Sequence, residues 1–377
     1  MGVTLRHFAY LNAVQEESLF ERPPEEFDLG SERRVLAMAL GATLYTPGTR
    51  ADFAQRVPRL ARLGVVSSVL CLEDAIADAD VDLAERNVAD QLQLIDRDVA
   101  VPPLLFVRVR HPDQVLRIVK ELGDAAHALC GFVFPKFVAA TGRDYFEALN
   151  EARSLARRPL YGMPVLETAE TLYAETRLGE LLAVRALLHE FASAVLSVRI
   201  GATDLCGLFG LRRGRDLTVY DLAVIREAIA DVINVFARDD EFSVSGPVWE
   251  HFGDTRIATP YPAGLALADL TREVVLDKAT GIVGKTVIHP SHVRPVHALY
   301  AVEAEEFADA HTVLAALPGG GVRRSAYANK MIESRPHARW AELIVRRAAA
   351  YGVLRPGRTW ADLLAAGGDT NAAGAAG

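Results

Sequence analysis

The feature that most constrains the fold of this chain is an alternation, repeated eight times, of short apolar runs with longer segments of helical periodicity. The expected strands are "VLAMALGATLY" (35–45), "VVSSVLCLE" (65–73), "PPLLFVRVR" (102–110), "CGFVFPKF" (130–137), "LYGMPVLE" (160–167), "AVLSVRIG" (194–201), "FSVSGPVW" (242–249) and "GIVGKTVIH" (281–289). The expected helices cover 50–63, 81–98, 112–123, 143–157, 169–192, 218–237, 264–278 and 291–316. Alternating strands and helices form parallel sheets. Eight such units predict an α/β protein with a closed (β/α)8 TIM barrel rather than an open doubly wound sheet.

Segments at both ends of the chain fall outside this repeat. We expect an N-terminal extension (1–35), a TIM-barrel catalytic domain (36–316), a C-terminal helical extension (317–366) and a disordered tail (367–377). The first extension is expected to form a helix and a loop, packed beside the barrel or covering its end. In the second, "SAYANKMIE" and "ARWAELIVRRAAAYGV" predict a helix pair. The tail "GGDTNAAGAAG" is small and polar, which is typical of disorder.

Composition excludes several classes of protein. The 377 residues carry a formal net charge of −8, whereas nucleic-acid binders show basic stripes. No apolar stretch approaches the roughly 18 residues of a membrane span, and the first residues lack an apolar signal core. The cysteines Cys71, Cys130 and Cys206 are widely spaced in apolar contexts, which predicts buried thiols rather than a zinc or redox pair. We therefore expect a cytoplasmic enzyme without nucleic-acid or membrane partners.

Ionisable residues gather at one end of the predicted strands. The carboxyl ends carry Glu73-Asp74, Arg108, Arg110-His111, Lys136, Glu167, Asp204, Trp249-Glu250 and His289. The opposite ends carry Pro102, Gly131, Tyr161 and Gly281, which are not acidic or basic. In a barrel the carboxyl ends share one rim, where active sites are built. The sequence therefore predicts a catalytic site at this rim.

Two acids and an arginine of this rim suggest its chemistry. Glu167 and Asp204 follow adjacent strands and can hold a hard divalent cation, Mg²⁺ or alternatively Mn²⁺. Arg108 offers a fork of donors to a substrate carboxylate or a developing enolate. A metal ion and an arginine suit cleavage or formation of a C–C bond next to a carbonyl. The alternative interpretation is a structural ion-pair ring of the same three residues.

Two further rim features each allow several interpretations. "YTPGTR" (45–50) is either a plain turn or a helix N-terminus whose Gly48 and Thr49 amides receive an anion. The amine of Lys136 can pair with Glu73 or Asp74, contact a substrate anion, or form a Schiff base.

Three other motifs lie near the later strands. "GLRRGRD" (210–216) places Arg212, Arg213 and Arg215 after Asp204, as a phosphate or polycarboxylate site, a solvated charge run or an interface element. "TVYD" (218–221) predicts a helix capping box. His289 either caps or packs locally, or orients another rim group.

Seven motifs occur in order between residues 44 and 293: "LYTPGTR", "CLEDAI", "FVRVR", "FVFPKF", "VLETAET", "GATDL" and "GKTVIHPSHV". Together they resemble the HpcH/HpaI aldolase and citrate lyase beta-subunit superfamily of TIM-barrel C–C bond lyases. The end segments "HFAYLNAVQEESLF" and "YANKMIESRPHARWAELIVRRAAAYGV" resemble one branch of it. That branch contains C–C bond lyase-like proteins associated with bacterial tellurite-resistance and stress gene clusters.

The resemblance implies roles for the matching residues. Glu167 and Asp204 would be Mg²⁺ ligands, and Arg108 would contact the substrate. Glu73 and Asp74 would complete the catalytic group behind Arg108 and the metal-bound waters. The remaining substrate-binding residues would be Gly48, Arg50 and Lys136. The resemblance also implies a 2-oxo acid or CoA thioester substrate and a homotrimer or homohexamer.

The chain departs from the family pattern at two motifs. Cys71 in "CLEDAI" stands where the family more often has the first aspartate of "DLEDAV". The seventh strand reads "SGPVWEHF" instead of a pattern near "AIDGVY", so Trp249 and Glu250 would alter the pocket. No residue matches a C-terminal catalytic aspartate, which leaves the general acid or base unassigned.

Three hypotheses about function follow. The leading one is a Mg²⁺-dependent lyase or aldolase that acts on a small carboxylated substrate through an enolate-like intermediate. The second is a transferase of the phosphoenolpyruvate type, which would use the same metal and the arginine loop at 212–215. The third is a non-catalytic barrel that serves as a scaffold in a stress-response complex.

Overall fold

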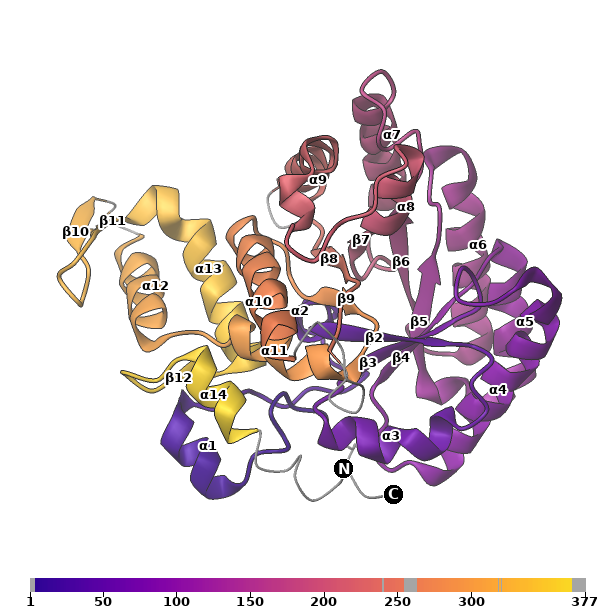
Figure 1. Ribbon diagram of the computed structural model, residues 1–377, viewed down its shortest axis with the longest axis horizontal. Helices are drawn as coiled ribbons and strands as arrows, with labels where there is room; N and C mark the ends of the chain where they lie inside the picture. The colour runs from indigo at the N-terminus through magenta and orange to yellow at the C-terminus, as the bar shows by residue number, and fades with distance from the viewer. Residues whose placement is uncertain (1–3, 239–240, 254–262, 318, 320, 368–377) are drawn as a thin grey trace.

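The predicted barrel is present in the computed structural model, which describes residues 4–238, 241–253, 263–317, 319 and 321–367. Eight parallel strands pair in sequence order, and the last pairs with the first, so the barrel is closed (Figure 1). They are β2 (Ala42–Pro47), β3 (Ser67–Cys71), β4 (Leu104–Arg108), β5 (Leu129–Phe134), β6 (Tyr161–Leu166), β7 (Val198–Ile200), β8 (Val244–Trp249) and β9 (Lys285–Val287). This confirms the (β/α)8 TIM barrel.

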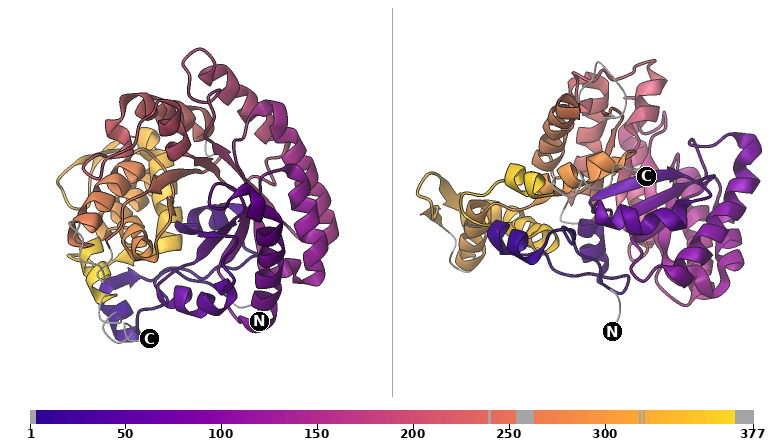
Figure 2. Two further views of the ribbon diagram at one scale, coloured as in Figure 1. Left: turned by 45° about the vertical axis from the view of Figure 1, so that its right-hand side comes forward. Right: turned by 60° about the horizontal axis from the view of Figure 1, so that its bottom comes forward.

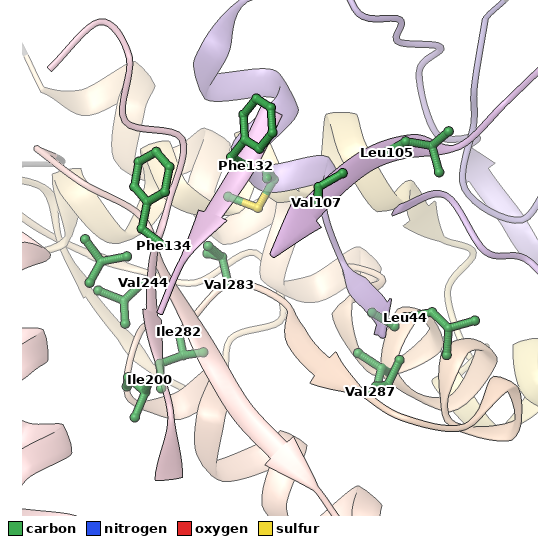
Figure 3. Packing of buried hydrophobic residues seen from close by; sticks show 14 of the residues in the cluster. Leu44, Leu105, Val107, Phe132, Phe134, Ile200, Val244, Ile282, Val283 and Val287 are labelled. Carbon is green, nitrogen blue, oxygen red and sulfur yellow. The ribbon is translucent and has the colours of Figure 1, made fainter. Parts of the chain in front are cut away.

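Helices surround the barrel and bury the outer face of its strands. The α-helices of the barrel wall are α3 (Phe53–Arg62), α4 (Val81–Asp98), α5 (Pro112–Leu122), α6 (Ala139–Ala156), α7 (Arg177–Glu190), α8 (Ala202–Leu208), α9 (Ala223–Phe236), α10 (Ala263–Ala279) and α11 (Val293–Tyr300). Short 3₁₀ turns are η1 (Asp78–Asp80), η2 (Gly123–Ala128), η3 (Val219–Asp221) and η5 (Pro290–His292). Figure 3 shows part of the apolar layer between strands and helices, including Leu105, Val107, Phe132 and Phe134.

Side chains alternate along the strands between this outer layer and the barrel interior. In β6, Met163 and Val165 belong to the interior cluster, whereas Leu166 belongs to the outer one. Because the side-chain period of a strand is two, the next inward position is Glu167. In β4, Phe106 belongs to the interior cluster, and the same alternation directs Arg108, two residues later, inward as well. The pattern that fills the barrel with apolar groups therefore also aims these two charged groups inward at its carboxyl end.

The first predicted strand was wrong in its first half. Residues 35–39 belong to helix α2 (Arg33–Ala39), and β2 starts only at Ala42. The segment "RRVLAMA" is rich in strong helix formers, and Gly41, with φ of 54°, allows the turn into the strand. Leu36 and Ala39 pack in the interior cluster, so α2 covers the amino end of the barrel.

Several helices differ from their predicted bounds. The helix expected over 169–192 starts at Arg177, because turns occupy residues 168–176, where Thr171 hydrogen-bonds Thr168. The last predicted helix, 291–316, is divided into η5, α11 and α12 (Ala304–Ala316). Helix α8, after β7, was not predicted. Local hydrogen bonds of this kind leave no trace in the apolar periodicity on which the prediction rested.

The two ends of the chain pack on each other beside the barrel. Strand β1 (Phe20–Arg22) pairs with β12 (Val353–Leu354), and α1 (Ala13–Leu19) contacts α14 (Trp360–Ala366). Both views of Figure 2 show the N-terminal segment next to the C-terminal helices. Helix α13 (Ser334–Tyr351) packs against both α12 and α2. The C-terminal extension is therefore joined to the amino end of the barrel.

One half of the predicted C-terminal helix pair is a hairpin instead. Strands β10 (Val322–Arg324) and β11 (Met331–Glu333) pair in the place of the helix expected over "SAYANKMIE". The backbone of Ser325 hydrogen-bonds Lys330, its hydroxyl bonds Asn329, and Ala328 is left-handed, so turn chemistry prevails over helix propensity. The hairpin lies at the edge of the molecule, away from the barrel (Figure 1).

Two other expectations concern the membrane and the tail. Among the described residues, no helix is long and apolar enough to cross a membrane. The predicted disordered tail lies, apart from Gly367, outside the described residues.

Candidate active site

Six charged residues from consecutive strand ends meet at the carboxyl rim of the barrel. Two acids follow β3, an arginine ends β4, a lysine follows β5, a glutamate follows β6, and an aspartate lies in the first turn of α8, after β7. We call them the rim cluster: Glu73, Asp74, Arg108, Lys136, Glu167 and Asp204. The structure thus brings together most of the residues to which the sequence assigned catalytic, substrate-binding or metal-binding roles.

Arg108 holds three carboxylates with one nitrogen. Its Nη2 lies 2.7 Å from Glu73 Oε2, 3.2 Å from Asp74 Oδ2 and 2.9 Å from Glu167 Oε1. Its Nε is buried without a hydrogen-bond partner among the described residues. Although burial alone would lower it, the neighbouring carboxylates, Glu167 first, raise the pKa of Arg108, so the guanidinium keeps its charge.

Lys136 connects the other acids. Its Nζ contacts Glu73 Oε1 and lies 3.3 Å from Asp74 Oδ1 and 3.9 Å from Asp204 Oδ1. Its backbone N–H donates to Glu167 Oε1 at 2.9 Å, from a left-handed conformation with φ of 47°. Despite partial burial, the acids raise the pKa of Lys136 to about 12. The ion pair of Lys136 with Glu73 and Asp74, one of the predicted interpretations, is therefore present.

The rim cluster carries an excess of negative charge. It contains four carboxylates and two cations, so with every group ionised its net charge is 2 − 4 = −2. Burial raises the pKa of Glu167 to about 7; Arg108 opposes this shift and the charge of Asp204 adds to it. Asp204 contacts Lys136, and no ion pair joins it to Arg108 among the described residues, so the predicted ring of three is not closed.

The arrangement around Glu167 fits a hard cation. Its Oε1 accepts from Arg108 and Lys136, while Oε2 faces Gly201, where a Cβ would approach it to 2.1 Å. Among the described residues, no group of three or more histidines, cysteines and acids is arranged to hold a metal. Mg²⁺, however, is commonly bound by one or two carboxylates and keeps several waters. Glu167 and Asp204 are carboxylate donors of the kind that this ion takes, and their role as its ligands stays a prediction.

Arg110 fixes the loop that carries two of the acids. Its guanidinium donates to the carbonyls of Leu72 at 2.6 Å, Glu73 at 3.2 Å and Ile76 at 3.0 Å. The Asp74 N–H in turn donates to Glu73 Oε2 at 2.8 Å. The sequence placed Arg110 at the rim, and the structure gives it this positioning contact.

The loop after β2 fits one of its two predicted interpretations, the plain turn. The Gly48 amide donates to the Cys71 carbonyl at 2.8 Å, and α3 begins only at Phe53. A Cβ at Gly48 would lie 2.7 Å from a Leu72 methyl, which explains the glycine. Arg50 is exposed and pairs with Asp52 at 3.4 Å. Substrate roles for Gly48 and Arg50 remain predictions.

The arginine loop at 212–215 is divided between solvent and interior. Arg212 and Arg215 are exposed, whereas Arg213 is buried, donates to Glu273 Oε2 at 2.6 Å and lies over the Trp249 ring. Arg213 therefore has a structural contact, whereas an anion site, a solvated charge run or an interface at the exposed Arg212 and Arg215 stays a prediction. Trp249 is fully buried, so it does not line a pocket.

Arg213 belongs to a group that we call the buried ion network: Arg213, Glu273, Asp277 and Lys285. Lys285 Nζ lies 2.8 Å from Glu273 Oε1 and 2.7 Å from Asp277 Oδ2. Tyr220 also donates to Asp277 at 2.6 Å. This network lies between β9, α10 and the loop after α8, and no motif in the sequence indicated it.

Three local predictions are confirmed. Thr218 and Asp221 form the capping box before α9. His289 caps η5, with Nδ1 2.7 Å from Ser291 Oγ. The three cysteines are free and buried.

Sequence reasoning overlooked Gly201 and Arg199. Gly201 leaves room for Glu167, and "GATDL" is its only signal. Arg199 of β7 is buried inside the barrel, where it donates to Thr286 Oγ1 at 2.6 Å and lies over the Tyr45 ring. Strand alternation in β7 would have predicted its inward direction.

Comparisons with known proteins agree with the fold. The model of a family described as C–C bond lyases of the TIM-barrel fold matches residues 34–353. CitE from Mycobacterium tuberculosis, solved in complex with magnesium, acetoacetate and coenzyme A, is 22% identical over 83% of this chain and 99% of its own, with a TM-score of 0.53. A citrate lyase from Burkholderia xenovorans LB400 is 16% identical over 86% and 96%, with a TM-score of 0.57. No curated protein sequence matches significantly. At these identities the two structures show a shared fold.

Proposed function

The chain belongs to the C–C bond lyase family of the TIM-barrel fold, and from this premise we propose that it is a Mg²⁺-dependent lyase or aldolase. Its substrate would be a small carboxylated molecule, a 2-oxo acid or an acyl-CoA, in which a C–C bond next to a carbonyl is cleaved or formed. The observation that carries the proposal is the rim cluster, whose four carboxylates exceed its two cations by two charges. A divalent cation would balance that excess.

Each residue of the cluster has a role in this proposal. Glu167 and Asp204 would hold Mg²⁺, which when bound supplies stabilisation of negative charge that develops on an oxygen beside the reacting bond. Arg108 would donate to the substrate carboxylate or carbonyl from a position fixed by Glu73 and Glu167.

Lys136 and the loop acids would set the charge and position of the site. The Lys136 ammonium, held between Asp74 and Asp204, would contact a second anionic group of the substrate. Arg110 would keep the acidic loop in place through its three carbonyl contacts. The site would therefore combine a hard cation with two fixed cationic side chains.

Support for the ligand classes comes from a structural relative. CitE from Mycobacterium tuberculosis was solved with magnesium, acetoacetate and coenzyme A. We extend Mg²⁺, a small acid and a CoA thioester to this chain as proposals. A homotrimer or homohexamer and a role in tellurite-resistance and stress gene clusters are proposed on the sequence resemblance. Mn²⁺ as an alternative ion is proposed from the two carboxylates, and a cytoplasmic location from the composition of the chain.

The test compares two variants in which a neutral amide replaces one of the proposed metal-binding carboxylates. Glu167→Gln and Asp204→Asn are assayed with Mg²⁺ on a panel of 2-oxo acids and acyl-CoA thioesters, and carbonyl product is measured. We expect at least about 100-fold slower turnover, because loss of outer groups alone typically costs about 10- to 100-fold. Circular dichroism should show folded protein. Glu190→Gln is the control, since Glu190 is exposed and pairs with Arg143 at 2.7 Å.

Three outcomes would count against the proposal. Full activity in both metal-ligand variants would contradict the assigned site. Phosphate transfer without carbonyl release would favour the transferase hypothesis. A well-folded protein that binds no Mg²⁺ at millimolar concentration would favour the scaffold.

A further inference from the structure

A cavity of 720 Å³ lies at the amino end of the barrel, on the opposite side from the rim cluster. Its walls come from α2, the ends of α9 and α10, the start of β8, the loop between α10 and β9, and one face of α13. Its volume falls in the range of about 300–1,000 Å³ that is typical of small-molecule sites. The C-terminal extension forms one wall, so the cavity exists only because this extension packs on the barrel.

The cavity concentrates positive charge on an acidic protein. Its basic lining residues are Arg33, Arg34, Lys278, Arg339, Arg346 and Arg347, and its acidic ones are Glu241, Glu303 and Glu306. Glu241 is already held by Arg185, which donates to both of its oxygens at 2.8 and 2.5 Å and is not part of the lining. The chain as a whole has a net charge of −8. The excess of cations in this cavity is therefore a local feature that favours an anion.

Two of these cations, one buried and one partly buried, are incompletely paired. Arg347 is 3% exposed; its Nε has no hydrogen-bond partner among the described residues, and its Nη1 lies 3.6 Å from Glu306. Lys278, whose side chain is 27% exposed, donates from Nζ to the Leu299 carbonyl at 3.4 Å, and its Nζ lies 3.9 Å from the same Glu306. Burial lowers the pKa of Lys278; Glu306 opposes this shift and Arg347 adds to it. Two cations whose shared carboxylate lies 3.6 and 3.9 Å away can accept further anionic groups.

Aromatic and apolar groups form the rest of the lining. The indole of Trp340 is 36% exposed, and Trp360 lies on the same cavity. On α13, Arg339, Leu343 and Arg347 are spaced by four residues, so they share one helix face with the indole beside them. An inorganic anion would leave the indoles and apolar walls uncovered. Phosphates joined to an aromatic base would engage both parts of the lining.

We propose that this cavity binds a nucleotide, with its phosphates toward Arg347 and Lys278 and its base against Trp340. The proposal goes beyond the lyase activity, because the cavity and the rim cluster lie at opposite ends of the barrel. Failure of one assignment therefore leaves the other intact.

Tryptophan fluorescence offers a direct assay. The chain has three tryptophans, of which Trp340 and Trp360 line the cavity and Trp249 is buried in β8. ATP and ADP are titrated into the full chain without divalent metal. We expect a saturable fluorescence change that pyrophosphate reverses by competition. Trp340→Phe should remove most of the change, while calorimetry still detects binding.

Charge variants test the recognition of phosphate. Arg347→Met should weaken ATP binding by about tenfold or more, since a charge-assisted phosphate contact is lost. Because Arg347 is buried, the exposed Arg339→Gln serves as a second variant, with a loss of about threefold or more. Arg143→Gln, which removes an exposed arginine paired with Glu190, should leave the affinity unchanged.

The proposal is overturned by any of three results. One is the absence of saturable binding by ATP, ADP and pyrophosphate. Another is unchanged ATP affinity in folded Arg347→Met and Arg339→Gln. The third is adenosine binding as tightly as ATP, which would show that the cations do not recognise phosphate.

Discussion

The rim cluster and the buried ion network are built from the same kinds of side chain but differ in charge balance and solvent access. The network has two cations and two carboxylates, and each of these four side chains is 5% exposed or less. The rim cluster has two cations and four carboxylates, and Lys136 and Asp74 are about half exposed, at 49% and 51%. One group is closed and neutral, while the other is open and negative.

This difference separates a structural role from a binding role. In the network, burial alone would lower the pKa of Lys285, but Asp277 and Glu273 raise it, whereas burial raises the pKa of Asp277 although Lys285 is beside it. In the rim cluster, burial raises the pKa of Glu167 to about 7 even though Arg108 is beside it. A raised carboxyl pKa therefore occurs in both groups, and what separates them is the charge balance, zero in the network and −2 at the rim, together with the solvent access of the rim. The presence of ion pairs alone would not have distinguished the two groups.

The largest expected effect is on the network. Lys285→Met leaves Glu273 and Asp277 buried without their lysine, which should lower the free energy of unfolding by about 3–5 kcal/mol. The same change at the rim, Lys136→Met, should alter it by less than about 1 kcal/mol, because that ammonium is half exposed. Urea denaturation of both variants measures the difference. If Lys136→Met lowered the free energy of unfolding more than Lys285→Met, the structural role would belong to the rim cluster and not to the network.

An effect of intermediate size on stability is expected from His7, a buried side chain that is kept neutral instead of being paired with an opposite charge. Burial lowers the pKa of His7 from 6.5 to about 3, and the Ala39 carbonyl opposes this shift. Between these values only the unfolded chain takes up the proton, so stability present above pH 6.5 is lost as the pH falls. At about pH 5 the loss from His7 should be about 2 kcal/mol.

Denaturation curves at about pH 7 and about pH 5 test this expectation. His7→Gln should show a pH-dependent loss smaller by about 2 kcal/mol than the unmodified chain. An equal loss in both would mean that His7 takes up its proton in the folded protein. Comparison with Lys285→Met then shows whether an uncompensated buried charge lowers the free energy of unfolding by a similar amount at His7 and in the buried ion network.

The smallest effect is on metal affinity. Lys136→Met changes the formal charge of the rim cluster from −2 to −3, one cation against four carboxylates. Mg²⁺ should then bind about fivefold more tightly, since a neighbouring positive charge is removed. Calorimetric titration measures this change. Weaker binding would mean that Lys136 acts mainly by positioning the acids.

The sequence was sufficient for the barrel and for part of the site because both follow from strand alternation. The two-residue period places Glu167 and Arg108 inward, and the carboxyl ends of parallel strands share one rim. The inward turn of Arg213 could not be predicted, because it depends on Glu273, sixty residues away in the chain. The helical start of the first predicted strand was missed because short apolar runs do not distinguish a strand from a buried helix.

Divalent-cation binding by the full chain tests the central claim most directly. Titration with Mg²⁺, followed by calorimetry, should show one ion per chain, and Glu167→Gln and Asp204→Asn should each abolish it. Glu190→Gln, at an exposed ion pair, should bind like the unmodified chain. The account would be contradicted if the folded protein bound no Mg²⁺ at millimolar concentration, or bound it equally well in both rim variants.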